Sequence, residues 1–251
     1  MAKLFKIALA EASPRIGILL SLPSPEIVEI CAEAGFDWLF IDMEHGLLDF
    51  AAVQRMVQAA AGRVPCIVRV PANEPAWIGK ALDTGADGLI FPHVNSAAEA
   101  AACVRAALYS PQGARSIGVA RSQGYGLRIR EDLASANSRV TLIAQAEHID
   151  AVGAVVSILE VPGLDAVFIG PLDLSASLGI PGQTGDVRVQ DAIGTVLGAA
   201  KARGIPAGIF AAGLEAAQAA AQKGFAFVCA DTDGTLLAGA ARQLIDGIRA
   251  R

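Results

Sequence analysis

The chain has 251 residues, of which 53% are hydrophobic and 5% aromatic, and its formal net charge is −5. This length is sufficient for one large core and is usual for a single β/α barrel. The acidic residues are scattered and aromatic residues are few, so neither a nucleic acid nor a membrane is an expected partner. A small soluble metabolite is the expected ligand.

Short β-branched or aromatic segments alternate with longer Ala- and Leu-rich segments of helical spacing. In chain order, the predicted strands are 16–21, 38–43, 66–70, 88–91, 141–146, 166–169, 206–210 and 225–230. The predicted helices are 25–34, 50–61, 75–84, 97–108, 151–159, 187–203, 214–223 and 235–248. Helices are closed by a glycine at positions that favour a left-handed C-cap, namely Gly35, Gly62, Gly85, Gly204 and Gly224. Eight strand–helix repeats predict a (β/α)₈ TIM barrel, with residues 1–251 as one catalytic domain.

One long interruption, from Tyr109 to Asn137, follows the fourth strand and helix. Loops of this length in compact domains are often functional. Its GARSIG segment (113–118) and Arg121 either bind an anionic part of a substrate or are simply solvated, and the sequence leaves both readings open.

The cysteines and the N-terminus indicate the compartment. Cys31, Cys66, Cys103 and Cys229 form neither a CxxC pair nor a Cys/His cluster, so they are expected to be small buried residues in a reducing environment. Lys6 interrupts the apolar N-terminus before it reaches the length of a signal peptide. No segment has the roughly 18 consecutive apolar residues of a membrane span. We therefore expect a cytoplasmic protein.

Polar residues gather at the C-terminal ends of the predicted strands, where β/α barrels place their reacting groups. By strand, these residues are Asp42, Glu44 and His45 after the second, Arg69 on the third, His93 after the fourth, Gln145 and Glu147 on the fifth, Asp173 after the sixth and Asp231 after the eighth. Residues two apart on a strand share one face. Gln145 and Glu147 are therefore expected to face one ligand, as are Asp42 and Glu44.

Glu147 and Asp173 form the predicted metal-binding pair. Carboxylates without a nearby cysteine suit Mg²⁺, Mn²⁺ or Co²⁺, and two protein ligands leave positions open for a chelating 2-oxo acid. The metal would polarise the keto group and acidify the neighbouring methyl group, while Arg69 would hold the developing oxyanion. Backbone N–H groups in GPLDLS, at a predicted helix start, would hold the substrate carboxylate.

The lysines argue against a Schiff base, which requires a lysine in the barrel mouth. They lie near the N-terminus or in predicted helices, at Lys3, Lys6, Lys80, Lys201 and Lys223.

The three histidines have different expected roles. His45 is the predicted general base, because imidazole exchanges protons near neutral pH. His93 either contacts the substrate or is a hydrogen-bonded loop residue. His148 should point away from the face used by Glu147, so a structural role is expected for it.

Six segments resemble the metal-dependent class II pyruvate aldolases of the HpcH/HpaI type: FDWLFIDMEHG, VRVPANEP, ALDTGADGLIFPHV, GARSIG, AQAEH and LDAVFIGPLDLSASLG. The resemblance covers residues 15–185 in order and implies a phosphoenolpyruvate/pyruvate-type barrel. It implies a divalent metal on Glu147 and Asp173, an enolate stabilised by Arg69, and His45 as base. Gln145 and the backbone at Gly170, Pro171 and Leu172 would hold pyruvate, with Asp42 and Glu44 in supporting positions around the metal site.

The resemblance also implies that the working enzyme is a homo-oligomer. Asp83 would reach the histidine of a neighbouring subunit, in a hexamer built as a trimer of dimers with the last helix exchanged. The chain departs from the family pattern at His93, His148 and Leu172.

The expected reaction is enolisation of pyruvate, or a close 2-oxo acid such as hydroxypyruvate, and its reversible addition to an aldehyde to give 4-hydroxy-2-oxo acids. The alternatives are an oxaloacetate-type decarboxylase on the same metal-enolate site, and a non-catalytic oligomeric metabolite-binding protein.

Overall fold

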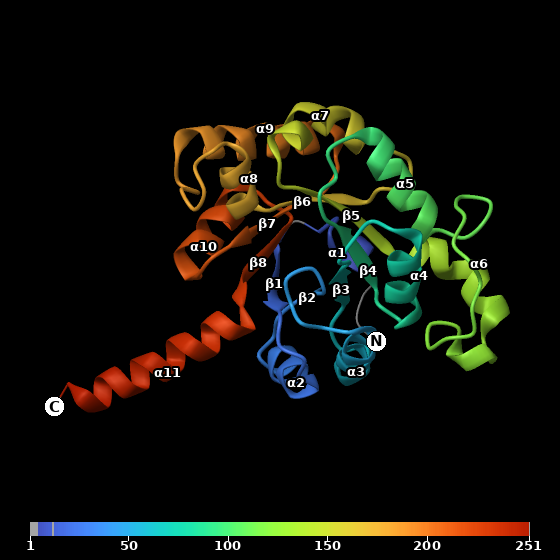
Figure 1. Ribbon diagram of the computed structural model, residues 1–251, viewed down its shortest axis with the longest axis horizontal. Helices are drawn as coiled ribbons and strands as arrows, with labels where there is room; N and C mark the ends of the chain where they lie inside the picture. The colour runs from blue at the N-terminus through green and yellow to red at the C-terminus, as the bar shows by residue number, and fades with distance from the viewer. Residues whose placement is uncertain (1–4, 12, 251) are drawn as a thin grey trace.

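Eight parallel strands close into a barrel in the computed structural model, which describes residues 5–11 and 13–250 (Figure 1). Each strand pairs with the next along the chain, and β8 pairs with β1. The strands are β1 (Arg15–Leu20), β2 (Trp38–Asp42), β3 (Cys66–Arg69), β4 (Gly88–Phe91), β5 (Thr141–Ala146), β6 (Ala166–Ile169), β7 (Ala207–Ala211) and β8 (Phe227–Thr232). The predicted (β/α)₈ fold is confirmed. Lys3, in the N-terminal segment considered above, lies outside the described residues.

The eight predicted helices are present with bounds within two residues of those expected. They are α2 (Pro25–Glu33), α3 (Phe50–Ala60), α4 (Pro75–Asp83), α5 (Ala97–Ala107), α7 (Ile149–Leu159), α9 (Val187–Arg203), α10 (Leu214–Lys223) and α11 (Asp233–Arg249). The five predicted glycine caps all have positive φ, from 65° to 91°.

The short elements α1 (Phe5–Ala8), η1 (Gly124–Gly126), α6 (Ile129–Arg139) and α8 (Pro171–Ser177) complete the structure. The segment interpreted as a loop therefore contains a helix, α6. Its IREDLASANSR sequence is largely polar and buries only Asp132 and Ala136. Without an apolar stripe, its helical period could not be seen in the sequence.

A layer of aromatic rings fills the lower part of the barrel. Trp38, Phe40, Phe168 and Phe227 point inward, and Phe5 of α1 closes the layer from below, with its ring centroid 5.3 Å from that of Trp38. A glycine on β7 makes room for one of these rings, since a Cβ atom at Gly208 would lie 2.3 Å from the ring of Phe227. The rings leave the upper end of the barrel for polar side chains.

A Gly-x-Asp repeat ties the strands together in pairs. Asp37, Asp87 and Asp165 directly precede β2, β4 and β6. Each follows a glycine with positive φ by two residues. Their carboxylates accept hydrogen bonds from the N–H groups of Ile16, Cys66 and Leu142, at 2.8, 2.9 and 2.9 Å. The N–H groups of the three aspartates in turn donate to the carbonyl groups of Ile16, Cys66 and Leu142, respectively. The two bonds join β1 to β2, β3 to β4 and β5 to β6.

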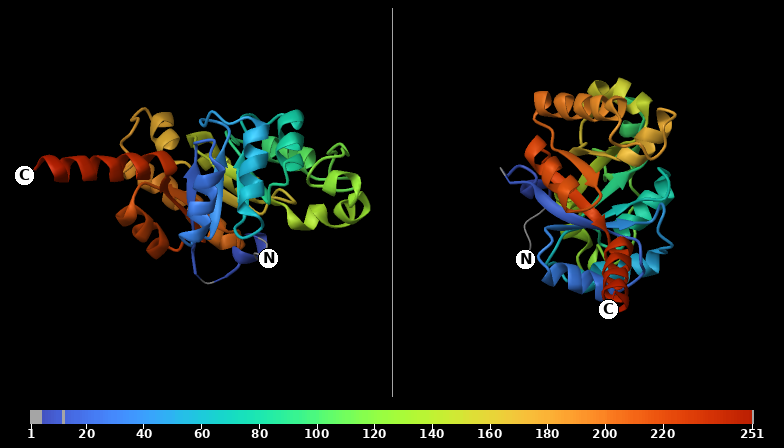
Figure 2. Two further views of the ribbon diagram at one scale, coloured as in Figure 1. Left: turned by 90° about the horizontal axis from the view of Figure 1, so that it is seen from below. Right: turned by 90° about the vertical axis from the view of Figure 1, so that its left-hand side faces the viewer.

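The helix α11 projects away from the barrel (Figures 1 and 2). Asp233 anchors its first turn, because its carboxylate accepts hydrogen bonds from the N–H and hydroxyl of Ser21 and the N–H of Leu22. Beyond that turn, Leu237 and Leu244 are 63% and 65% exposed. One apolar face of α11 therefore has no cover within the described part of this chain.

All four cysteines are buried free thiols, as expected. Burial raises the pKa of the Cys103 thiol to about 12, with the charge of Glu99 adding to the effect. Within residues 5–11 and 13–250, no helix is both long and apolar enough to cross a membrane.

The aromatic layer makes Gly208 a sensitive position. We expect Gly208→Ala to lower the free energy of unfolding by about 1–3 kcal/mol, because the ring of Phe227 has to move. The control is Gly194→Ala in α9, where an added Cβ meets no atom within 4 Å; alanine should raise helix stability there by about 0.5–1 kcal/mol. Urea unfolding measures both changes. Equal effects of the two substitutions would contradict this account of the barrel interior.

Asp87 predicts a pH dependence. Burial raises the pKa of its carboxyl group, against the opposing effects of the Cys66 N–H, Arg121 and Arg139. A raised pKa in the folded state stabilises the protein at low pH, and this contribution is lost as the pH rises through the folded pKa. The unfolding free energy of Asp87→Asn relative to the wild type should therefore increase between about pH 4 and pH 7.

Asp87→Ala, measured over the same pH range, distinguishes the effect of the Asp87 charge from that of its hydrogen bond to the Cys66 N–H. It leaves the Cys66 N–H without its acceptor, so it should lower stability by about 1–3 kcal/mol at every pH. A stability difference for Asp87→Asn that falls with rising pH would show that the carboxylate is stabilising in its charged form.

Candidate active site

Four buried polar side chains lie at the C-terminal end of the barrel, above the aromatic layer. Asp42 ends β2, Arg69 ends β3, and Gln145 and Glu147 lie at the end of β5. Their exposed fractions are 2%, 7%, 1% and 2%. The alternation of side chains along parallel strands brings them to one mouth, as the spacing of the sequence indicates.

Arg69 is held in one orientation by two carboxylates. Its Nε and Nη2 donate to the two carboxylate oxygens of Asp42 at 2.8 and 2.7 Å, and its Nη1 lies 3.1 Å from Oε2 of Glu44. Below it, the ring centroid of Phe40 lies 5.1 Å from the guanidinium carbon. Burial alone would lower the pKa of Arg69, but the hydrogen bonds and charge of Asp42 raise it above its usual value. The guanidinium is a fixed positive charge at the mouth.

Glu44 belongs to the same group. Its side chain is 9% exposed, and its N–H donates to Oδ1 of Asp42 at 3.0 Å. Burial raises the pKa of Glu44 and the nearby Glu147 adds to this, while Arg69, His93 and His45 oppose it. Three carboxylates therefore face the guanidinium of Arg69, which leaves an excess of negative charge suited to a cation.

His93 lies between two of these carboxylates. Its Nε2 is 2.8 Å from Oε1 of Glu44, and its Nδ1 is 3.0 Å from Oε1 of Glu147. Among the described residues, Glu44, His93 and Glu147 form a group whose ligand atoms all lie within 4.8 Å of one another. Gln145 donates its amide N–H to Oε2 of Glu147. The donor set is mainly oxygen with one nitrogen, which fits a divalent metal.

The predicted metal partner Asp173 lies on the first turn of α8 and is exposed. Gly170, the N-cap of this helix, lies against Glu147: a Cβ there would be 3.3 Å from Oε2 of Glu147. The glycine thus keeps the space beside the carboxylate open toward α8. Pro171 is buried and Leu172 is 62% exposed at the start of the same helix.

His45, the predicted base, stands at the rim of the mouth. Its side chain is 67% exposed, and Nε2 lies 3.9 Å from Oε2 of Glu44. Its N–H lies 3.4 Å from Oδ1 of Asp42. The imidazole is therefore beside the carboxylate group and accessible to a substrate.

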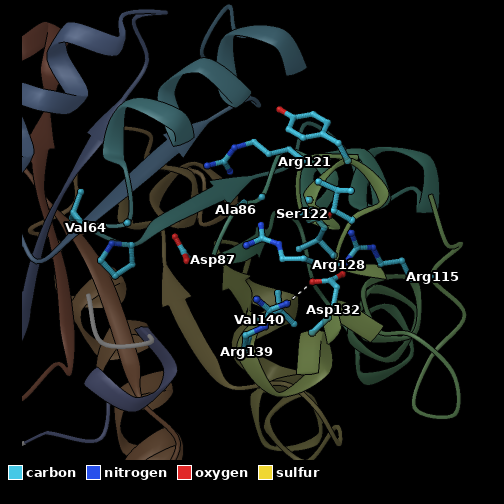
Figure 3. Close-up of a pocket in the computed structure, with 18 residues that line it drawn as sticks. Val64, Ala86, Asp87, Arg115, Arg121, Ser122, Arg128, Asp132, Arg139 and Val140 are labelled. Carbon is cyan, nitrogen blue, oxygen red and sulfur yellow. Dashed lines mark hydrogen bonds and ion pairs between the residues drawn. The ribbon is translucent and has the colours of Figure 1, made fainter. Parts of the chain in front are cut away.

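Asp83 lies at the other end of the barrel. It is the last residue of α4, is 31% exposed and forms an ion pair with Arg115 at 2.7 Å. Arg115 lines a cavity of about 760 Å³ that is bordered by residues directly before β3, β4 and β5 (Figure 3). Because the strands are parallel, this cavity and the catalytic mouth are at opposite ends.

The GARSIG segment and Arg121 belong to this same lower region. Arg121 lines the cavity and donates to the carbonyl of Thr84 at 2.9 Å, and the guanidinium of Arg115 lies 4.6 Å from the ring centroid of Tyr109. Neither arginine contacts the mouth of its own barrel. The structure therefore does not support the interpretation that GARSIG and Arg121 bind a substrate at the mouth of their own chain.

The placement of His93 could not be deduced from strand alternation, because its backbone leaves the extended region (φ +52°). His148 caps α7, where its Nδ1 accepts a hydrogen bond from the N–H of Asp150 at 3.2 Å, in agreement with the expected structural role.

Comparison with known proteins gives concordant matches. Residues 15–240 match the family model described as HpcH/HpaI aldolase/citrate lyase. A hydroxypyruvate/pyruvate aldolase from Paraburkholderia phytofirmans is 39% identical over 252 residues, covering 97% of this chain and 96% of the relative. A 4-hydroxy-2-oxovalerate aldolase from Rhodococcus jostii is 42% identical over 236 residues, covering 93% and 91%. The crystal structure of an HpcH/HpaI aldolase/citrate lyase family protein from Burkholderia cenocepacia J2315 has a TM-score of 0.93 and 38% identity, covering 98% of both chains.

Proposed function

The chain belongs to the HpcH/HpaI aldolase/citrate lyase family, and from this premise we propose that it is a metal-dependent class II aldolase. As a carbon–carbon lyase, it enolises pyruvate or a close 2-oxo acid such as hydroxypyruvate, and adds it reversibly to an aldehyde to give 4-hydroxy-2-oxo acids. The observation that carries the proposal is the excess of buried carboxylate around Arg69 at the barrel mouth.

The lysines support metal chemistry over a Schiff base. Within the described chain, Lys6 lies in α1 below the barrel, and Lys80, Lys201 and Lys223 lie in the surrounding helices α4, α9 and α10. None of these lysines therefore supplies an amine at the mouth to form an imine with a 2-oxo acid.

Glu147 and Asp173 are the proposed ligands of Mg²⁺, Mn²⁺ or Co²⁺. The fit is supported by a buried oxygen that lacks a hydrogen-bond partner among the described residues, Oε1 of Gln145. When bound, a divalent ion supplies Lewis-acid polarisation of the keto group.

The chain's own residues perform the remaining steps. Arg69, fixed by Asp42, presents its guanidinium to the oxygen that becomes negative on enolisation. Gln145 and the backbone at Gly170, Pro171 and Leu172 orient the 2-oxo acid. His45, at the rim, accepts the methyl proton and returns a proton when the bond is cleaved. Asp42 and Glu44 hold Arg69 in its catalytic orientation.

Oxaloacetate-type decarboxylation would pass through the same enolate, but it is not favoured, since the relatives from Paraburkholderia phytofirmans and Rhodococcus jostii are both named aldolases. A purely metabolite-binding role is likewise not favoured, because the acidic, arginine and histidine side chains of a catalytic site are all present at the mouth.

Deuterium exchange tests enolisation directly. With Mg²⁺, Mn²⁺ or Co²⁺, the wild type should exchange the methyl protons of pyruvate for deuterium in D₂O, as followed by NMR. Glu147→Gln should slow this exchange by on the order of 10²-fold or more. The control is Glu33→Gln, which changes only a surface ion pair with Arg63 at the other end of the barrel. No exchange by the wild type with any of the three ions would refute the proposal.

A homo-oligomer is the proposed working unit, a hexamer built as a trimer of dimers. Two observations support assembly: the uncovered apolar face of α11, with Leu237, Leu244 and Ile248 exposed, and the position of Asp83 far from the His45 of its own chain. Exchange of α11 between subunits would cover its apolar face. Asp83 of a neighbouring subunit would orient His45.

We place this assembly in the cytoplasm, with residues 1–251 of each subunit as one domain. The four free thiols support this compartment.

Subunit mixing tests the role of Asp83. Asp83→Ala and His45→Ala should each lower kcat by on the order of 10²–10⁴-fold. Hybrid oligomers reassembled from the two variants should regain activity, because some sites then combine an intact His45 with a neighbour's intact Asp83. Light scattering checks that hybrids form. Hybrids with no more activity than either parent would show that Asp83 does not act across the interface.

A further inference from the structure

The ring of His93 is 65% exposed and lies between the carboxylates of Glu44 and Glu147, and we propose that its Nδ1 is a ligand of the metal. Nδ1 binds the ion beside Glu147, while Nε2 faces Oε1 of Glu44. This inference rests on the proposed function and adds to it a nitrogen ligand and therefore a metal preference.

The contact distances fit such a ligand. Donor atoms on adjacent positions of one octahedral ion are about 3 Å apart when each bond is about 2.1 Å. Nδ1 of His93 lies 3.0 Å from Oε1 of Glu147, so one ion can contact both residues with little movement. Nε2, at 2.8 Å from Oε1 of Glu44, has the carboxylate partner that metal-binding histidines use to fix the orientation of their ring.

The backbone turns His93 toward this position. His93 has a φ of +52°, a conformation that costs a non-glycine residue about 1–2 kcal/mol. The chain is held there by two hydrogen bonds: the N–H of His93 donates to Oε1 of Glu147 at 2.7 Å, and Asn73 donates to the carbonyl of Pro92 at 2.5 Å. The conformation is thus maintained by the carboxylate that the ring contacts.

A second observation indicates a ligand beside the same carboxylate, Glu147. Gln145 is 1% exposed, and its Nε2 donates to Glu147, yet its Oε1 is buried without a hydrogen-bond partner in the described chain. A buried acceptor without a donor is costly. A metal ion held by Glu147, or a water bound to that ion, would satisfy it.

The nitrogen ligand sets the metal preference. Mg²⁺ takes oxygen ligands almost exclusively, whereas imidazole strengthens the binding of Co²⁺, Ni²⁺ and Zn²⁺. The site should therefore bind Co²⁺ more tightly than carboxylates alone would allow, with a smaller effect of His93 on Mg²⁺.

Metal titration of the full-length protein tests this inference. His93→Asn preserves a residue that tolerates positive φ, and His93→Gly removes the ring altogether. Calorimetry should show that either variant binds Co²⁺ roughly 10–100-fold more weakly than the wild type, with a smaller change for Mg²⁺. The visible spectrum of bound Co²⁺ should change, and added imidazole should restore it in His93→Gly. The matched control is His148→Asn, an exposed histidine whose replacement retains a helix-capping side chain.

The outcomes separate the two proposals. Wild-type Co²⁺ affinity and spectrum in both folded His93 variants would overturn the role of His93, and metal-dependent deuterium exchange would still support the aldolase. Failure of the wild type to bind any divalent ion would overturn the proposed function together with this inference.

Discussion

Buried negative charge at the barrel mouth is the constraint on which the site depends. Asp42, Glu44 and Glu147 are desolvated there, and the positive charge that faces them comes from Arg69. Burying carboxylates without compensation is costly. A divalent ion would relieve this cost, and its positive charge, together with that of Arg69, would then stabilise the negative charge that develops on a substrate oxygen. Metal binding and catalysis therefore have one electrostatic origin.

The barrel supplies the conditions for that field. The aromatic layer around Trp38 and Phe168 closes the interior below the mouth, and the Gly-x-Asp repeat pins neighbouring strands together at their N-terminal ends. Charges above a closed apolar layer are weakly screened by water. The rigid strands also hold Arg69 and Glu147 at fixed positions, so little reorganisation is required when the substrate binds.

Much of this arrangement follows from the sequence because parallel barrels obey simple geometric rules. Strand alternation and the location of reacting groups at strand ends were enough to place Asp42, Arg69, Gln145 and Glu147 at one mouth. The helix bounds followed from apolar periodicity and from glycine caps such as Gly204 and Gly224, which have the expected positive φ.

The features that strand alternation and apolar periodicity do not predict depend on other physics. The helix α6 is polar and has no apolar period to detect. His93 turns into the mouth through a left-handed backbone, which strand alternation does not describe. Asp83 was identified from the family resemblance rather than from its position, since it lies at the far end of its own barrel and would act only in an assembly. Likewise, α11 has an apolar face that the described part of this chain does not cover.

The most direct test of the central claim is the anomalous difference map of crystals grown with Mn²⁺ and oxalate, a stable mimic of the pyruvate enolate. The account predicts one strong peak at the mouth of the barrel, in contact with Glu147 and with the oxalate oxygens, and oxalate beside Arg69. A manganese peak only elsewhere, such as in the cavity near Arg115, would contradict it.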